Sequence, residues 1–511
     1  MPRTKQLIKL TASNYLATII KFVVMVYLTR EMFLQLPKES YGFWALLWSI
    51  FGYSVLLDLG FGIALQKKTS EVLVHQDWDS YNRTASTLFG TYFLLGFVIV
   101  LLTCLSAPFL HVIFVFEPGQ RLIYTQCFLF FGIGTGLLFP FGIFMEVLRG
   151  ALCIQVRNRI EVLRDIANCI ALVIALRMHA DIRVLAVIAV TSQCLANIAM
   201  YIATKRALPR LRLSWRLYSP TKMVELMSFS LCAYVITISN LIVFRTDQIV
   251  ISALAGVGLV AYYHVTTRVA EMFRLLCSQI HDLLAPMSSS FNAQQDKQAL
   301  RQLLLRSQRF VCLIVVLLIV PSWFFVEDLL RIWLELDNQQ TFWCARILLL
   351  NIAILVIYRN TTNQILLMCG YQKPLMWIGI TECIANLILS CLLIKPLGIL
   401  GVALGTLIPN ILLAIFVNIP MTRKFTKTSH WESYKPLIVV GFTVGLPFAS
   451  GLVLFEQVTA SYNSLLHIIA VSVICAIPAL FSAYKCCLSA SERRQLKHII
   501  SSMLPRWQLK L

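Results

Sequence analysis

Residues 85–107, ASTLFGTYFLLGFVIVLLTCLSA, form a long, mainly apolar run with no charged side chain. The part LLGFVIVLLTCLSA (94–107) would place apolar residues on every side of a helix. A membrane-spanning strand would instead alternate apolar and polar residues over about ten positions. Because about 20 apolar residues cross the roughly 30 Å hydrocarbon core of a bilayer as an α-helix, this stretch predicts a transmembrane helix.

Similar runs recur along all 511 residues, of which 58% are hydrophobic and only 13% charged. This composition lies far outside the range of soluble domains. The predicted fold class is therefore all-α integral membrane. The sequence predicts about fourteen transmembrane helices, at 7–28, 41–62, 85–107, 122–145, 160–177, 183–204, 224–245, 256–285, 310–328, 342–366, 375–395, 399–419, 436–455 and 464–485.

Several kinds of site are disfavoured by the same sequence. The basic segment 1–11 leads into a span that is too long for a signal-peptide core, so we expect it to be retained. The fifteen cysteines form no CxxC pair and no Cys/His spacing suited to zinc, so we assign no disulfide and no metal. A Walker A pattern is absent, and the longest stretches between spans are about twenty residues. We therefore expect no cofactor and no enzyme activity.

The 44 lysines and arginines are unevenly distributed over the loops. With residues at span ends assigned to the adjoining loop, 31 lie at the N-terminus, in every second loop and in the C-terminal tail, and 9 lie in the other loops. By the positive-inside rule, this asymmetry places both termini in the cytoplasm. The net charge of +20 thus reports topology and contact with anionic lipid, and no aromatic-interleaved basic surface indicates nucleic-acid binding.

Two stretches of the chain resemble each other. LRDIANCIALVIAL (163–176) aligns with ITECIANLILSCLL (380–393) at an offset of 218, and Thr204-Lys205-Arg206 falls on Thr422-Arg423-Lys424 at the same offset. Six spans separate the copies, so the repeat is parallel and predicts two pseudosymmetric six-helix lobes, an architecture typical of transporters. The predicted organisation is an N-terminal lobe (1–206), a basic linker (207–223), a C-terminal lobe (224–428), two additional helices (429–485) and a basic tail (486–511).

Three motifs resemble the polysaccharide-transporter family, the Wzx-type O-antigen flippases of the multidrug/oligosaccharidyl-lipid/polysaccharide (MATE-like) superfamily. They are YGFWALLWSIFGYSVLLDLGFGIALQKKTSE (41–71), FRTDQIVISALAGVGLVAYYHVTTRVAE (244–271) and IANLILSCLLIKPLGILGVALGTLIPN (384–410). The resemblance implies alternating access and transfer of an undecaprenyl-pyrophosphate-linked oligosaccharide from the cytoplasmic to the periplasmic leaflet of a bacterial inner membrane. It does not carry over the sugar, and many members of the family have twelve spans.

Charges inside the spans indicate where a substrate would bind. A charge facing lipid near the centre of a helix costs about 2.5–3.5 kcal/mol, so such groups are expected to face protein or water. On a helical wheel of span 256–285, one arc of about 160° holds the polar side chains, and valines, leucines and other apolar residues lie opposite. The polar arc contains Thr267, Arg268, Glu271, Arg274, Ser278, Gln279, His281 and Asp282.

Four cations lie inside spans: Lys21, Arg268, Arg274 and Arg359. Glu271 is expected to pair with one arginine of its own helix, three residues away on either side. The remaining positive charge favours a water-filled cationic cavity for a pyrophosphate, because guanidinium groups bind phosphate oxygens bidentately. An exporter of organic cations would be expected to have an acid-rich cavity.

Two further groups of residues are candidates for supporting roles. His264, Glu271 and Glu382 are candidates for coupling transport to a proton or sodium ion, with a purely structural pairing as the alternative. Asp58, Glu146, Arg149, Arg245 and Asp247 lie near helix ends and are candidates for gate residues or helix-end anchors.

The leading hypothesis is a monomeric flippase for an O-antigen or capsular repeat unit, with polysaccharide polymerase and chain-length machinery as candidate partners. The alternatives are a lipid II flippase and a cation-coupled multidrug antiporter of the same superfamily. A polysaccharide polymerase or ligase is disfavoured, because such enzymes resemble proteins with a large periplasmic loop, and the longest loop on that side here is about a dozen residues.

Overall fold

A computed structural model describes residues 2–58, 60–116, 118–223, 231–458, 465–487 and 492–494. These residues form helices and short connections, and no strand occurs among them. The prediction of an all-α fold is confirmed. The chain divides into two compact units, Met1–Val265 with Met376–Thr406, and Thr266–Leu375 with Leu407–Leu511. They are called unit 1 and unit 2 below, and the predicted division into lobes, linker and tail stays a prediction.

Unit 1 contains most of the N-terminal helices and one segment from later in the chain. Its elements are α1 (Pro2–Gln35), α2 (Lys38–Gly52), η1 (Tyr53–Asp58), α3 (Phe61–His75), α4 (Trp78–Ser106), η2 (Ala107–Phe109), α5 (Leu110–Ile113), η3 (Pro118–Gln120), α6 (Arg121–Leu138), η4 (Phe139–Gly142), α7 (Ile143–Gly150), α8 (Ile154–Arg177), α9 (Ile182–Ala207), η5 (Trp215–Leu217) and α11 (Leu231–Leu254). The helices α12 (Val257–Ala293), α17 (Gln372–Leu397) and α18 (Ile399–Leu413) each have residues in both units.

Unit 2 contains the remaining helices. They are α13 (Lys297–Phe324), α14 (Val326–Leu334), α15 (Gln339–Ile354), η6 (Leu355–Asn360), α16 (Thr361–Met368), η7 (Ala414–Asn418), α19 (Ile419–Thr426), α20 (His430–Val440), η8 (Gly441–Gly445), α21 (Leu446–Val458), α22 (Leu465–Ser482) and η9 (Ala483–Cys487). The elements η6 to η9 are π-helical turns. The earlier η elements are 3₁₀ turns.

Ten helical segments of the described part of the chain are long and apolar enough to cross a membrane. They coincide with ten of the predicted spans. The other four predicted spans fall on α1, α8, α11 and α12, which have 34, 24, 24 and 37 residues. Residues 224–230, at the start of one predicted span, lie outside the described residues. The chain is thus a multi-pass membrane protein, and the count of fourteen with both termini inside stays a prediction.

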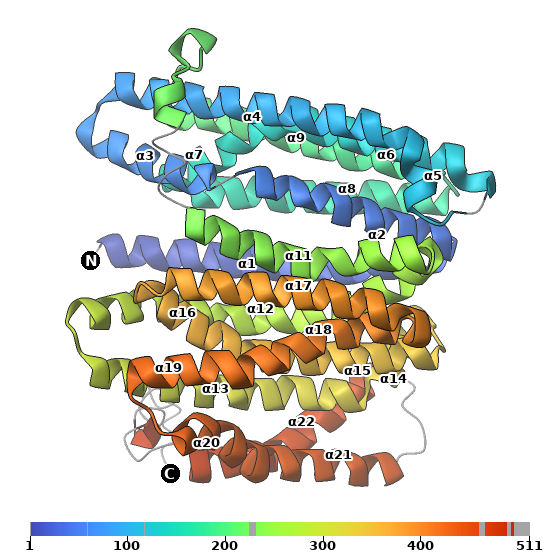
Figure 1. Cartoon of the computed structure of the whole chain (residues 1–511), viewed down its shortest axis with the longest axis vertical. Helices are drawn as coiled ribbons and strands as arrows, with labels where there is room; N and C mark the ends of the chain where they lie inside the picture. Colours follow the sequence, from blue (N-terminus) through green and yellow to red (C-terminus); the bar gives the residue numbers. More distant parts are fainter. Residues whose placement is uncertain are drawn as a thin grey trace, which may run out of the picture. The chain divides into compact units, whose positions relative to one another are not determined.

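Small residues allow the helices of unit 1 to pack closely. In Figure 1, α4, α6 and α9 run side by side. A Cβ on Gly96 of α4 would lie 2.3 Å from the carbonyl oxygen of Gly136 on α6. A Cβ on Gly134 would lie 2.5 Å from Val190 on α9. The GIGTG segment (132–136) therefore brings backbones together, as small residues do between membrane helices.

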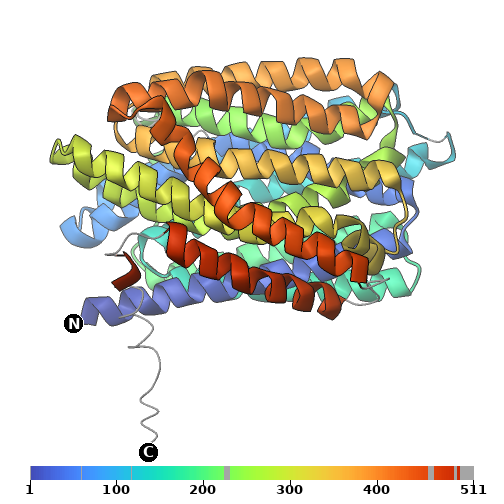
Figure 2. The same cartoon turned by 90° about the horizontal axis from the view of Figure 1, so that it is seen from below.

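In unit 2, α13 packs against α15 and α20, and α21 packs along α22. Figure 2 shows α21 and α22 as adjacent red helices at the C-terminal end of the chain. Two π turns, η6 and η7, also pack against each other. A π turn inserts one extra residue into an α-helix and often lies at a functional site.

Both repeated asparagines bond to a neighbouring helix of unit 1, Asn168 as an acceptor and Asn386 as a donor. The Oγ of Ser192 on α9 donates to Oδ1 of Asn168 on α8, at 2.9 Å. The Nδ2 of Asn386 on α17 donates to Oγ1 of Thr406 on α18, also at 2.9 Å. Each asparagine of the aligned Ile-Ala-Asn segments thus bonds to the helix that follows it in sequence.

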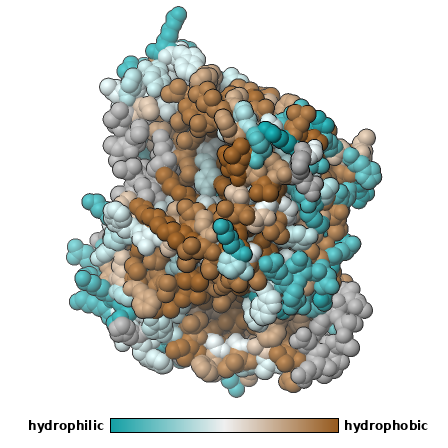
Figure 3. Space-filling view, turned by 45° about the vertical axis from the view of Figure 1, so that its right-hand side comes forward, coloured by the Kyte–Doolittle hydropathy of each residue, from teal (hydrophilic) through white to brown (hydrophobic). Residues whose placement is uncertain are grey.

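Apolar side chains cover much of the face of the molecule shown in Figure 3. On α4, a row of large apolar residues is exposed, namely Phe93, Leu94, Phe97, Leu101, Leu102 and Leu105. A patch of this kind suits contact with lipid. The structure therefore has the surface expected of a membrane protein.

The contact between Gly96 and Gly136 leads to a prediction about stability. Gly136→Leu should lower the free energy of unfolding by about 1–3 kcal/mol or more, because its side chain overlaps the backbone of α4. The apparent Tm of the detergent-purified protein, followed by size-exclusion chromatography after heating, measures this. Gly142→Ala is the control, since a Cβ at Gly142 meets nothing within 4 Å. An unchanged Tm in Gly136→Leu would contradict the close packing.

Candidate functional site

The polar arc predicted for α12 is partly exposed in the structure, and its apolar face is packed. Arg268 Nη1 donates to Glu271 Oε2 at 2.8 Å, with 29% and 37% of the side chains exposed. On the other face, Val265 and Val269 are fully buried. The predicted pairing of Glu271 with an arginine of its own helix is confirmed. Arg274 is half-buried, and the side chains of Ser278, Gln279, His281 and Asp282 lie outside those described.

Lys21 on α1 binds a carboxylate that its own sequence neighbourhood does not contain. Its Nζ donates to Oε2 of Glu161 on α8, 140 residues away. Arg157, one turn earlier on α8, donates from Nε to the other oxygen of Glu161 at 3.0 Å. Glu161 is 7% exposed and so holds two cations at once. Lys21 is thus paired, and its predicted role in binding substrate stays a prediction.

Arg359 lies in the π turn η6 of unit 2 and is almost completely buried. Its Nη1 donates to Oδ1 of Asn410 on α18 at 3.2 Å. Asn410 in turn donates to Oδ1 of Asn351 on α15 at 2.8 Å. The amide oxygen of Asn410 thus binds the buried guanidinium, and Asn351 holds Asn410 in place. A further amide pair joins the same part of unit 2, where Nδ2 of Asn418 on η7 donates to Oδ1 of Asn363 on α16 at 3.3 Å.

Asp247 on α11 is the centre of a buried polar cluster in unit 1. Its Oδ2 accepts hydrogen bonds from the Tyr263 hydroxyl and from Thr406 Oγ1, the latter at 3.0 Å. Nδ2 of Asn386 donates to Oγ1 of Thr406 and so connects α17 to the carboxylate through Thr406. All four side chains are at most 5% exposed. We call Asp247, Tyr263, Asn386 and Thr406 the Asp247 cluster.

The Asp247 cluster has oxygen atoms left over. Oδ1 of Asp247 and Oδ1 of Asn386 are buried and have no hydrogen-bond partner among the described residues. A buried carboxylate oxygen without a partner is costly unless a proton or a cation satisfies it. The arrangement is chemically suited to hold a proton or a hard cation, which prefers oxygen ligands.

Two predicted coupling residues are buried in unit 1. His264 on α12 is 7% exposed, and its Nδ1 lies 2.9 Å from the hydroxyl of Tyr41 on α2. Glu382 on α17 is 4% exposed and lies one helical turn before Asn386. Their roles in coupling stay predictions.

The predicted gate residues lie in two places in unit 1. Asp58 accepts a hydrogen bond from the Tyr92 hydroxyl and another from the backbone N–H of Gly62, at 3.0 Å. A Cβ on Gly62 would lie 3.3 Å from Asp58 and 3.1 Å from Glu146, so the two carboxylates flank this glycine. Glu146 also accepts from Arg149 at 2.8 Å.

Arg245 and Asp247 are two residues apart on α11 but make different contacts. Nη1 of Arg245 donates to the backbone carbonyl of Trp48 on α2 at 3.0 Å. This bond joins two helices, as an anchor would. Asp247 instead lies in the buried Asp247 cluster, whereas the sequence predicted it only as a gate or helix-end residue.

Sequence reasoning missed Glu161, Asn351, Thr406 and Asn410 as partners of the predicted residues. Their contacts join helices that are distant in sequence. The sequence contained one signal for the Asp247 cluster, because Asn386, which was also missed, lies at the repeated Ile-Ala-Asn position. Nothing comparable in the sequence marks Glu161 as the partner of Lys21.

The Glu161 contacts lead to a second prediction. Glu161→Gln leaves Lys21 and Arg157 facing a neutral amide and should lower the free energy of unfolding by about 1–3 kcal/mol, less than a fully buried pair because Lys21 is partly exposed. The apparent Tm measures the loss. A Tm equal to that of the parent would mean that the pair is not stabilising.

Glu71 on α3 supplies the matched control for this experiment. A hydrogen bond from Lys68, at 2.8 Å, lowers the pKa of this exposed carboxyl. Glu71→Gln also removes an acid from between two lysines, but at the surface, where exposed pairs contribute little. Its Tm should stay close to that of the parent.

Comparison with known proteins identifies the family. Residues 4–292, more than half of the chain, match the family model described as polysaccharide biosynthesis protein. No curated protein matches the chain.

Several solved structures share the fold. The lipid II flippase MurJ, in an inward closed conformation, has a TM-score of 0.71 at 13% identity, over 92% of this chain and 97% of MurJ. An inward-facing multidrug resistance MATE family transporter has a TM-score of 0.68 at 14% identity, over 80% and 98%. A MOP superfamily transporter from Pyrococcus furiosus, described as having a binding pocket of reverse polarity, has a TM-score of 0.58 at 13% identity, over 82% and 97%. At these identities the likeness concerns the fold.

Proposed function

The chain belongs to the polysaccharide biosynthesis protein family, and we propose that it is a flippase for an undecaprenyl-pyrophosphate-linked oligosaccharide. The carried unit would be an O-antigen or capsular repeat, moved from the cytoplasmic to the periplasmic leaflet of a bacterial inner membrane. The fold shared with MurJ and MATE transporters supports alternating access as the means. The proposal includes a monomer that passes its product to polysaccharide polymerase and chain-length machinery.

The observation that carries the proposal is the partly exposed cationic surface of α12. Arg268 and Arg274 are only partly buried, and the single described acid between them, Glu271, is already bound by Arg268. Arginine is suited to a pyrophosphate, because its planar guanidinium binds phosphate oxygens with two parallel hydrogen bonds. Two arginines on one partly exposed stretch of α12 suit an anionic headgroup better than a cationic drug.

Arg268 and Arg359 should both be needed for transport. Arg268→Ala should reduce surface polysaccharide at least about tenfold, the effect of losing roughly 1.4 kcal/mol of binding. Because Arg359 is buried, Arg359→Gln is the better test there, since its amide can still donate to Asn410. Surface polysaccharide is measured by gel electrophoresis, and the amount of protein in the membrane by immunoblot.

Arg121, an exposed arginine at the start of α6, provides the matched control, and Arg121→Ala should leave polysaccharide unchanged. Full polysaccharide in both Arg268→Ala and Arg359→Gln would overturn the cationic binding site. Loss of the protein from the membrane would be seen in the immunoblot and would call for Arg268→Lys, which keeps the charge.

In this proposal an ion gradient drives transport, and the coupling ion binds at the Asp247 cluster. The cluster joins α11, α12, α17 and α18 through one buried carboxylate, so binding a proton or sodium ion there would change the packing of four helices. Its uncommitted oxygen atoms on Asp247 and Asn386 support a cation more directly than do His264 and Glu271, which already have close partners. Glu382 lies near enough along α17 to take part.

This coupling site makes a prediction about thermal stability. A ligand that binds only the folded state stabilises it by about 2.7 kcal/mol at a concentration of roughly 100 times its Kd. Sodium chloride should therefore raise the Tm of the parent above its value in potassium chloride of equal ionic strength, and Asp247→Asn should remove the difference. If a proton is the ion, the two salts give equal Tm values, and the dependence of Tm on pH changes in Asp247→Asn.

Asp337, whose side chain is 81% exposed, is the control, and Asp337→Asn should behave as the parent does in both measurements. If neither the salt nor the pH response depends on Asp247, the coupling assignment is wrong. The polysaccharide assay is independent of this result, so the flippase proposal can stand without it.

A lipid II flippase is the second candidate, favoured by the TM-score of 0.71 with MurJ. Deletion of the gene separates the two functions. An O-antigen or capsular flippase should leave viable cells in which a lipid-linked oligosaccharide accumulates on the cytoplasmic face, whereas loss of a lipid II flippase should be lethal. A multidrug antiporter would instead raise resistance to cationic dyes when overexpressed.

A further inference from the structure

The end of α9 and the segment that follows it are strongly basic and take no part in the sites described above. Residues 205–218 read KRALPRLRLSWRLY, with five basic residues and no acidic one. From here on we call residues 205–218 the basic linker, a range that begins two residues before the linker predicted at 207–223 and ends within it. In Figure 1 it is drawn in green, after α9 and beside the beginning of α4, and both helices belong to unit 1.

Side chains of α4 hold the backbone of the basic linker in place. Asn82 donates to the carbonyl of Arg210 at 3.2 Å and accepts from the N–H of Arg212 at 2.9 Å. One turn later, Ser86 Oγ accepts from the N–H of Ser214 at 3.1 Å. These hydrogen bonds satisfy backbone N–H and C=O groups in a segment that belongs to no helix or sheet. The segment therefore has a fixed path along α4.

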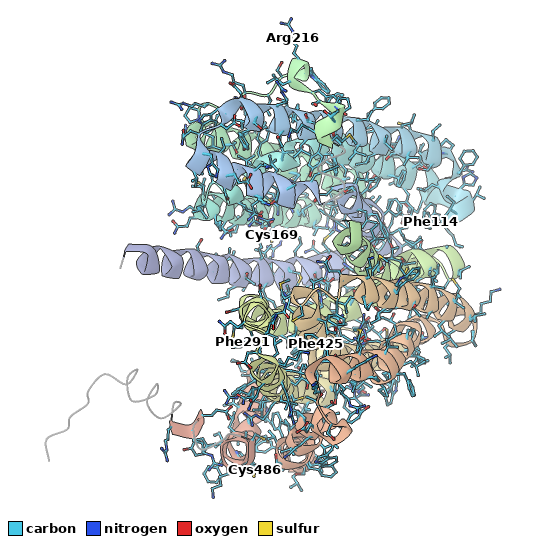
Figure 4. The ribbon with its side chains drawn as sticks, turned by 60° about the vertical axis from the view of Figure 1, so that its left-hand side comes forward. Phe114, Cys169, Arg216, Phe291, Phe425 and Cys486 are labelled. Carbon is cyan, nitrogen blue, oxygen red and sulfur yellow. The ribbon has the colours of Figure 1, made fainter. Side chains whose placement is uncertain are left out.

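The fixed path sorts the side chains of the basic linker by direction. Leu208 and Leu211 are at most 2% exposed and join the core that contains Tyr81 and Leu88 of α4. Arg210 and Arg212, on either side of Leu211, are exposed, because successive side chains of an extended chain point in opposite directions. Arg206 is exposed as well, and Figure 4 shows Arg216 pointing away from the helices.

Trp215 joins the basic linker to the lipid-facing side of α4. Its ring packs edge-to-face on Phe93, with the ring centroids 5.2 Å apart. Trp215 is 60% exposed and Phe93 51%. Phe93 begins the exposed apolar row that continues through Leu94 and Phe97. Tryptophan is enriched at the boundary between hydrocarbon and headgroups, so the position of Trp215 beside the apolar row is the one expected at that boundary.

Gly90 provides the space for this arrangement. A Cβ at Gly90 would lie 2.8 Å from the ring of Tyr218 and 3.3 Å from that of Trp215. Together with Asn82 and Ser86, spaced four residues apart, it forms one ridge of α4 on which the linker rests. A larger side chain at this position would displace the aromatic rings without removing any arginine.

We propose that the basic linker is a binding site for the headgroups of anionic phospholipids. Trp215 would sit at the hydrocarbon boundary, with Arg210, Arg212 and Arg216 at the level of the phosphates. Guanidinium groups bind phosphate oxygens strongly, and basic residues next to a membrane attract anionic lipid. The continuity of the site with the apolar row of α4 favours a bilayer lipid over a soluble polyanion.

The experiment uses the full chain in vesicles of phosphatidylcholine mixed with phosphatidylglycerol. Lipids with brominated acyl chains quench tryptophan fluorescence on contact, and the difference between the parent and Trp215→Phe isolates the Trp215 signal. Brominated phosphatidylglycerol should quench Trp215 more strongly than brominated phosphatidylcholine. In the variant Arg210→Gln/Arg212→Gln/Arg216→Gln this excess should fall by at least about fivefold, the effect expected for losing even one basic residue near an anionic surface.

Two further variants complete the test. Arg121→Gln/Arg177→Gln/Arg183→Gln removes three exposed arginines that lie elsewhere in unit 1, at ends of α6, α8 and α9, and should keep the excess quenching. Gly90→Leu should reduce quenching of Trp215 by both lipids, because it displaces the ring without changing the charge. Equal quenching of the parent by the two brominated lipids would overturn the proposal. Absence of quenching by either lipid would overturn it too and would indicate that the linker faces water or another protein chain.

Discussion

Lipid offers no hydrogen bonds, so each polar group within a membrane helix must find its partner in the protein or in a water-filled space. This constraint accounts for the polar contacts of the described structure. Asp247, Glu161 and Arg359 are all buried, and each is bound by side chains from other helices. These contacts also determine which helices pack together, since α1 meets α8 through Lys21 and Glu161.

Local features of the sequence predicted what depends on local structure. The apolar runs predicted helices, because a run of that length can satisfy its backbone only as a helix in lipid. The pairing of Arg268 with Glu271 followed from a spacing of three residues on one helix. The close approach of Gly136 to Gly96 depends on the absence of a side chain at these two positions. In each case the deciding interaction is short in sequence or depends on the size of one residue.

The parts that were not predicted depend on contacts between distant segments. Lys21 has no acid within a turn of its own helix, so the sequence left it as a free cation, and only the packing of α1 on α8 supplies Glu161. Asp247 was assigned to a helix end, because nothing local shows that Tyr263 and Thr406 converge on it. Arg359 likewise depends on Asn410, 51 residues away. Helix-wheel reasoning assigns a face to a residue but does not say which helix lies opposite.

The π turns η6 and η7, which pack against each other in unit 2, change the direction in which the later side chains of their helices point. Each turn of η6 and η7 holds one residue more than an α-helical turn, which rotates everything that follows by about 100° relative to a continuous α-helix. Side chains of α15 and α16 that are spaced for one common face therefore point to different faces. The helical periodicity that assigns side chains to faces therefore has to be counted anew after Asn360. One inserted residue in such a helix changes which neighbouring helix a later side chain contacts, although the chemistry of that side chain is unchanged.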